Sequence, residues 1–191
     1  MFELTADNVI AYLKDQGHLP SDESATAVEL GWGVSNIVLR ILRTAGDDWV
    51  LKQSRPQLRT DVPWFSRVER IHREADVMRI LQPLLPAGVI PAIVREDREN
   101  YWFAMQAIDR GHVVWKQSLL QGAADAAIAA KLGDYLATIH RETCLHPELT
   151  EPLADCTVFE ELRVDPFYRH LAKKCADVRE PLEALIDEMA A

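Results

Sequence analysis

The first half of the chain carries a glycine-rich turn, a strand lysine and a helix glutamate, and the order of these features strongly constrains the fold. The glycine-rich segment 31–36 (Gly-Trp-Gly-Val-Ser-Asn) lies between two runs in which apolar and polar residues alternate. Lys52 ends the next apolar run, and Glu74 follows on a stretch with helical periodicity. Strands joined by short turns and followed by one helix predict an antiparallel sheet with that helix packed against it.

The glycine-rich segment has the composition of an anion-binding turn. A backbone that closely approaches a phosphate needs residues without a Cβ, and its N–H groups can then point at the anion. Gly31 and Gly33 meet this need, Ser35 adds a hydroxyl donor, and Asn36 completes the motif. A pair of glycines one residue apart is also typical of ordinary hairpin turns, so this interpretation depends on the residues that follow.

Lys52 and Glu74 are expected to form an ion pair. Taken alone, Lys52 is better interpreted as an edge lysine that faces solvent. Glu74, however, lies three residues beyond Ile71, which belongs to the apolar face of the helix. A carboxylate that faces the core needs a partner, and Lys52 on the adjoining sheet would then lie over nucleotide phosphates. In the alternative arrangement Glu74 is solvated, and Glu69 or Arg73 takes the inner face.

The hydrophobic periodicity of the remaining chain predicts the order of elements. We expect a short helix over 5–16 ending at Gly17, strands within 25–53, a helix over 64–81, and a hairpin formed by 92–95 and 101–108. After Gly111 only helices are expected, over 123–141, 166–176 and 180–191. The change of character at 109–111 predicts two units, residues 1–108 and 109–191.

The apolar run 101–108 enters this boundary. Backbone groups of such a connector can bond the edge of an adenine ring, and Met105 would shape the back of the pocket. Gln106 and Ile108 complete the candidate nucleotide contacts. An apolar strand is also compatible with a purely structural role in the core.

Composition excludes several classes of function. The net charge of −9 argues against nucleic acid as a partner, because phosphate backbones are bound by basic surfaces. The chain has 3 cysteines without metal-site spacing, which are expected to be reduced thiols. The sequence shows neither a signal-peptide pattern nor a long apolar run, so no membrane partner is expected. The expected compartment is the cytoplasm.

Residues 29–108 resemble the N-terminal lobe of the aminoglycoside phosphotransferase and choline kinase-like family, including its methylthioribose kinase-like members. The matching segments are 31–36, Val50-Leu51-Lys52, Arg73-Glu74-Ala75 and Met105-Gln106-Ala107-Ile108. Downstream, Leu132 to His140 is similar to the long helix of the family's second lobe, and Phe159 to Tyr168 to a segment that precedes its catalytic loop. The resemblance covers nearly the whole chain and depends on the order of these motifs.

The resemblance implies an α+β, protein-kinase-like fold: an antiparallel-sheet N-lobe with one main helix, plus the first helices of an α-helical C-lobe. It also implies ATP as cofactor and phosphorylation of a hydroxyl on an aminoglycoside, a sugar or an amino alcohol. The nucleotide contacts would be Gly31, Gly33, Ser35, Asn36, Lys52, Glu74, Met105, Gln106 and Ile108.

The catalytic half of the family's site has no counterpart in the sequence. The family uses a His-Gly-Asp loop with a downstream asparagine, followed by a metal-binding aspartate. Gly133-Asp134 and His140-Arg141-Glu142 resemble parts of this loop, but Ile139 and Pro147 stand where asparagine is required. No catalytic or metal-binding residue is therefore assigned, and Mg²⁺ is expected only in a full-length relative.

The sequence thus predicts a chain truncated before the catalytic loop and inactive alone. We expect such a chain to self-associate through residues 112–191, where apolar helix faces would be left uncovered. The alternative is a non-catalytic nucleotide- or partner-binding module from a shortened kinase gene.

Overall fold

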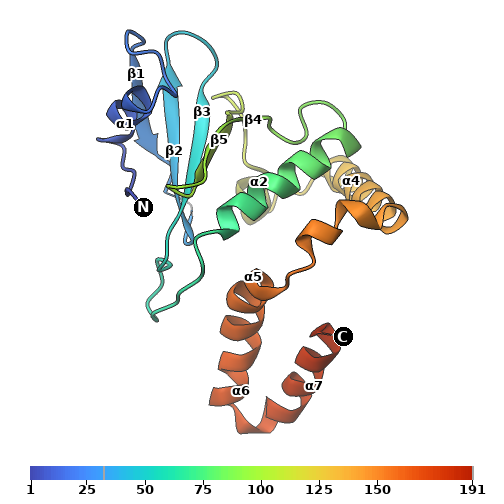
Figure 1. Ribbon diagram of the computed structural model, residues 1–191. Helices are drawn as coiled ribbons and strands as arrows, with labels where there is room; N and C mark the ends of the chain where they lie inside the picture. Colours follow the sequence, from blue (N-terminus) through green and yellow to red (C-terminus); the bar gives the residue numbers. More distant parts are fainter. Residues whose placement is uncertain (32, 191) are drawn as a thin grey trace.

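A five-stranded antiparallel sheet forms the first half of the molecule. The computed structural model describes residues 1–31 and 33–190, with chain order and layers shown in Figure 1. The strand order is β1-β2-β3-β5-β4. The strands are β1 (Ala25–Glu29), β2 (Asn36–Arg43), β3 (Trp49–Ser54), β4 (Ile93–Asp97) and β5 (Trp102–Gln106). The strands expected within 25–53 and the later hairpin are confirmed.

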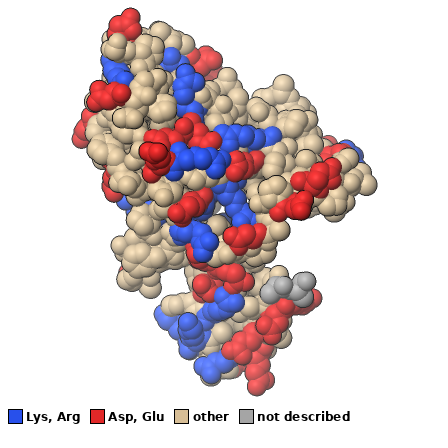
Figure 2. Space-filling model, in the orientation of Figure 1, with Lys and Arg blue, Asp and Glu red and all other residues tan. Residues whose placement is uncertain are grey.

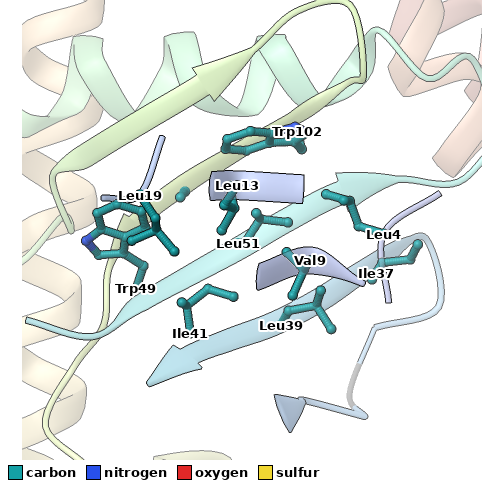
Figure 3. Packing of buried hydrophobic residues seen from close by; sticks show 11 residues of the cluster. Leu4, Val9, Leu13, Leu19, Ile37, Leu39, Ile41, Trp49, Leu51 and Trp102 are labelled. Carbon is teal, nitrogen blue, oxygen red and sulfur yellow. The ribbon is translucent and has the colours of Figure 1, made fainter. Parts of the chain in front are cut away.

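Helix α1 (Val9–Asp15) covers one face of the sheet. Its residues Val9 and Leu13 are fully buried against alternate residues of β2 such as Leu39. Figure 3 shows these side chains interdigitating with those of β3 and β5. Gly17 adopts a φ of +71° directly after the helix, as predicted for its C-terminal glycine.

Helix α2 (Arg70–Leu81) packs on the opposite face. Ile71 and Ala75 are fully buried against Phe103 of β5. On its outer side, Arg79 pairs with Asp76 at 2.8 Å and also with Glu96 of β4. Figure 2 shows acidic and basic side chains intermixed across the middle of this face, over α2. The sheet therefore has a helix on each face.

The predicted start of α2 near Trp64 is wrong, because the helix begins at Arg70. Residues 56–58 and 64–66 instead pair with each other: the Leu58 N–H donates to Trp64 O at 2.9 Å, and the Ser66 N–H to Pro56 O at 3.1 Å. These hydrogen bonds hold the segment before Arg70 in an extended hairpin.

The rest of the chain is helical. It contains η1 (Gln82–Leu84), α3 (Trp115–Leu120), α4 (Ala126–Leu145), η2 (Pro147–Leu149), η3 (Glu151–Leu153), α5 (Thr157–Phe159), η4 (Glu160–Arg169), α6 (His170–Lys174), η5 (Ala176–Val178) and α7 (Arg179–Ala190). Helix α3 does not follow from the sequence pattern. Helix α4 starts at Ala126 rather than near 123, because the side chain of Asp125 accepts the N–H groups of Ala127 and Ile128. No helix of the described residues is both long and apolar enough to cross a bilayer.

The helix expected to start at Pro166 begins earlier. Pro166 lies inside η4, a π-helical segment that continues from α5 into α6. Pro166 has no N–H to donate, so it interrupts the backbone hydrogen bonds of the helix at this point. Arg169 stabilises the segment by binding Glu160 at 2.5 Å and Asp165 at 2.6 Å. The α+β architecture expected from the sequence is confirmed. In this half the expected boundaries are wrong for α4, which covers 126–145 rather than 123–141, and for the helix expected over 166–176, whereas α7 agrees to within one residue.

Candidate nucleotide-binding site

Lys52 and Glu74 meet on the α2 face of the sheet. Lys52 lies opposite Phe103 in the β3–β5 ladder and so shares its face, and its ammonium donates to the Glu74 carboxylate. The predicted ion pair is confirmed. The Lys52 side chain is 22% exposed and that of Glu74 38%, so the pair lies at the edge of the core. Such a pair contributes about 1 kcal/mol or less to stability, but it fixes the position of the ammonium.

The glycine-rich turn closes the hairpin between β1 and β2. The Leu30 N–H donates to Val38 O at 2.8 Å beneath it. A Cβ on Gly33 would lie 3.0 Å from Asn36 O, whereas one on Gly31 would meet nothing within 4 Å. A side chain at Gly33 would therefore crowd the backbone at Asn36, whereas one at Gly31 would not. Trp32, at the centre of the motif, lies outside the described residues.

The segment after β3 holds the carbonyls of this turn. The Arg55 N–H donates to Ser35 O at 3.1 Å and the Arg59 N–H to Val34 O at 2.9 Å. Within the part of the chain that the structure describes, no hydrogen bond uses the N–H of Gly33 or Ser35. The carbonyls of Val34 and Ser35 are bonded, and the N–H groups of Gly33 and Ser35 have no partner among the described residues, so the turn has the donor set of an anion cradle.

Arg70 is a site residue that the sequence analysis missed. It is 7% exposed, and its guanidinium donates to Ser35 O at 2.5 Å and to Arg55 O at 2.8 Å. Asn36, a predicted nucleotide contact, places its side-chain oxygen 3.5 Å from the same guanidinium. The sequence does contain a signal for this role: Arg70 precedes Glu74 by four residues, so the two side chains share one face of the helix.

In the connector at the end of β5, residues 106–110, several backbone groups already form hydrogen bonds within the protein. The Gln106 N–H donates to Ala92 O at 2.9 Å, and Ile108 O accepts from Arg40 at 3.0 Å. Among the described residues, no hydrogen bond uses the Ile108 N–H. Met105 is half-buried against the α2 cluster. The adenine edge would therefore meet the Ile108 N–H beside Met105, and this role stays a prediction.

Asp48 anchors the connector to the sheet. It binds the guanidinium of Arg110 at 2.9 and 3.0 Å and that of Arg40 at 3.0 Å. Its own backbone carbonyl accepts the Ala107 N–H at 2.9 Å. The bond to Arg110, joined by those from the Arg43 N–H and Arg40 and opposed by burial, lowers the pKa of Asp48 to about 2. The acidic side chain is thus ionised throughout the physiological range.

The assembled groups suit a nucleotide better than a metal ion. Lys52 holds an ammonium against Glu74, and the turn and the connector have N–H groups without a partner among the described residues. Such donors could hold phosphates and an adenine edge, and this role stays a prediction. No three His, Cys, Asp or Glu side chains cluster as metal ligands in the described ranges 1–31 and 33–190, so no residue is assigned to Mg²⁺.

In protein-kinase-like phosphotransferases, a lysine on a strand of the sheet pairs with a glutamate on a helix, and a glycine-rich turn joins two strands of the same sheet. The chain has this arrangement. The sequence profile of the phosphotransferase enzyme family matches residues 26–191, and the chain belongs to this family. The resemblance inferred from the sequence motifs and the protein-kinase-like fold that it implied are thereby confirmed.

Several curated relatives are methylthioribose kinases. That of Pectobacterium atrosepticum is 26% identical over 181 residues, which are 87% of this chain and 44% of the relative. That of Yersinia pestis (strain Pestoides F) is 28% identical over 136 residues, 70% of this chain and 33% of the relative. That of Pectobacterium carotovorum is 24% identical and covers 97% of this chain and 50% of the relative. The chain spans half or less of the length of these relatives.

Proposed function

We propose that this chain is the ATP-binding portion of a small-molecule kinase. Residues 1–108 would form the nucleotide-binding lobe and residues 109–191 the first helices of the second lobe. The observation that carries the proposal is the Lys52–Glu74 ion pair on the α2 face of a sheet whose first hairpin ends in a glycine-rich turn. This pair adds little to stability, so its value lies in holding a cation at a defined place.

The chain's own residues would bind and orient the nucleotide. ATP, when bound, supplies the phosphoryl group that is transferred. Lys52 would neutralise charge on the phosphates, and Glu74 would keep the ammonium from turning into solvent. The N–H groups of Gly33 and Ser35 would donate to phosphate oxygens, and the connector at Ile108 would hold the adenine edge.

The acceptor is proposed from the relatives. Because the relatives are methylthioribose kinases, we propose a sugar hydroxyl as the acceptor, ahead of an aminoglycoside or an amino alcohol. The catalytic base and the Mg²⁺ ligands are assigned to no described residue, and the proposal for this chain is therefore nucleotide binding. The free thiols of Cys144, Cys156 and Cys175 support a reducing, cytoplasmic setting.

Calorimetric titration with ATP tests the nucleotide site. We expect Lys52→Met to weaken ATP binding by about tenfold or more, because a desolvated phosphate contact to an ammonium is lost. Lys14→Met is the matched control: Lys14 lies on α1, where its ammonium binds Ser21 O at 3.0 Å, away from the glycine-rich turn. Equal ATP affinity of the wild type and Lys52→Met would refute the proposed site.

A transfer assay separates the two classes of function. Phosphorylation of methylthioribose by ATP, lost in Lys52→Met, would establish the kinase activity. ATP binding without transfer to any sugar would instead support a non-catalytic nucleotide-binding module.

A further inference from the structure

Arg70, the first residue of α2, joins three separate segments of the chain. It is 7% exposed, and its guanidinium donates to the carbonyls of Arg55 at 2.8 Å and Ser35 at 2.5 Å. It also donates to Ser66 O at 3.1 Å and Arg67 O at 2.7 Å, in the segment that leads into α2. One side chain therefore holds the glycine-rich turn, the end of β3 and the start of the helix.

The guanidinium is bonded mainly by backbone carbonyls. No salt bridge found among the described residues includes Arg70. Burial lowers the pKa of Arg70, and the nearby charges of Glu161, Glu74 and Glu69 oppose this shift. The planar guanidinium has donors in fixed directions and can serve several carbonyls at once, which the single ammonium of a lysine cannot do in the same geometry.

These three segments also carry the proposed phosphate-binding groups. Ser35 belongs to the glycine-rich turn, Arg55 follows Lys52 by three residues, and Glu74 lies one helical turn beyond Arg70 on the same face of α2. A change at this guanidinium would remove its bond to the turn and so move the turn relative to the ion pair, while Lys52 and Glu74 themselves are unchanged.

We propose that Arg70 is a positioning residue that sets the glycine-rich turn against Lys52 and Glu74 for phosphate binding. This inference rests on the proposed nucleotide site. It assigns Arg70 no contact with the nucleotide, because Nη1 and Nη2 of its guanidinium donate to carbonyls of the protein.

Binding of ATP and of adenosine by Arg70→Lys and Arg70→Met tests the proposal. We expect ATP affinity to fall about tenfold while adenosine affinity stays within about twofold, because only the phosphate end depends on the turn. Arg43→Lys is the matched control: Arg43, at the far end of β2, binds both oxygens of Glu23 at 2.8 and 2.9 Å and Ala45 O at 2.9 Å. Arg43→Lys should lower the melting temperature without changing either affinity.

Hydrogen exchange in the nucleotide-free protein provides a readout that does not depend on binding. The N–H groups of Arg55 and Arg59 donate to the turn carbonyls, so both should exchange faster in Arg70→Lys than in wild type. Unchanged exchange, or an equal loss of ATP and adenosine affinity, would overturn the proposal. So would failure of both variants to fold by circular dichroism, since Arg70 would then be purely structural. If the wild type binds neither ATP nor adenosine, the proposed function is refuted. Hydrogen exchange at Arg55 and Arg59 would then still decide whether Arg70 holds the turn.

Discussion

At the scale of single residues, the two glycines of the turn have different roles. Neither Gly31 nor Gly33 has a left-handed φ, so backbone conformation alone requires neither of them. A Cβ at Gly33 would crowd the backbone, because it would lie 3.0 Å from the carbonyl oxygen of Asn36, where β2 begins. Gly31 faces open space. The sequence motif treats the two positions alike, and only the packing distinguishes them.

We therefore predict that Gly33→Ala weakens ATP binding by about tenfold, because the turn must move away from Asn36 and displace its N–H groups. Gly31→Ala should change the melting temperature very little, since a Cβ added there would meet nothing within 4 Å. Titration calorimetry and differential scanning fluorimetry measure the two effects. Equal losses of affinity in both variants would mean that the close approach at Gly33 does not shape the turn.

At the scale of secondary-structure elements, acidic side chains join segments that are distant in sequence. Asp48 ties the connector at Arg110 to the start of β3. Glu161 of η4 binds the segment before α2: its carboxylate accepts from the Ser66 hydroxyl at 2.8 Å and pairs with Arg67 at 3.0 Å. Although burial opposes the change, these bonds lower the pKa of Glu161.

The Asp48 network predicts a specific loss of stability in acid. Its pKa falls from 3.8 to about 2 on folding, so its contribution is fully present above pH 4 and is lost as the pH falls toward 2. The shift corresponds to about 2 kcal/mol. Asp48→Asn should thus have a lower free energy of unfolding than wild type at pH 7, and its free energy of unfolding should fall less between pH 4 and pH 2. Urea unfolding at pH 7, 4 and 2 measures these free energies. Equal losses between pH 4 and pH 2 in the two proteins would contradict the prediction.

The Glu161 contact predicts a local effect. Glu161→Ala should accelerate hydrogen exchange at Arg67, whose N–H donates to the carboxylate at 3.0 Å. Glu160→Ala is the control, because Glu160 pairs with Arg169 inside its own helix. Mass spectrometry of peptides spanning 64–68 measures both variants. The contact would not hold the two segments together if exchange were the same in Glu161→Ala and wild type.

At the scale of the whole molecule, the helical half is less buried than the sheet half. No described residue of α4 is buried, and Ile128, Leu132 and Leu136, which share one face of the helix, are 39%, 42% and 56% exposed. Figure 1 shows α4 beside α2, and below them α6 and α7 as a separate helical hairpin. An exposed row of large apolar side chains on one helix face is unusual on a monomer surface and commonly forms contacts.

We predict that the chain self-associates through this face of α4. Sedimentation velocity should show a dimer or larger species, and Leu132→Glu with Leu136→Glu should shift it toward monomer because the new charges repel across the contact. Ala130→Glu adds the same charge to another face of the helix and should leave the association unchanged. A monomeric wild type that does not enhance the fluorescence of a hydrophobic dye would exclude self-association through α4.

The sequence by itself determined those features that depend on local periodicity. Alternation of apolar residues defined β2, and a short apolar run defined β3. The position of Gly17 marked the end of α1, and the spacing from Ile71 to Glu74 placed the carboxylate toward Lys52. Each depends on residues close together in the chain, where helix and strand geometry fixes which side chains share a face.

Only the tertiary structure decided the features that depend on contacts between distant residues. Helix α2 starts at Arg70 rather than near Trp64 because the preceding segment pairs with 56–58 and because Trp64 donates its indole N–H to Glu161 O at 2.9 Å. The role of Arg70 follows from carbonyls at positions 35 and 55 that no local pattern brings to it. Hydrogen bonds across such separations form only once the segments are packed, so local propensity could not reveal them.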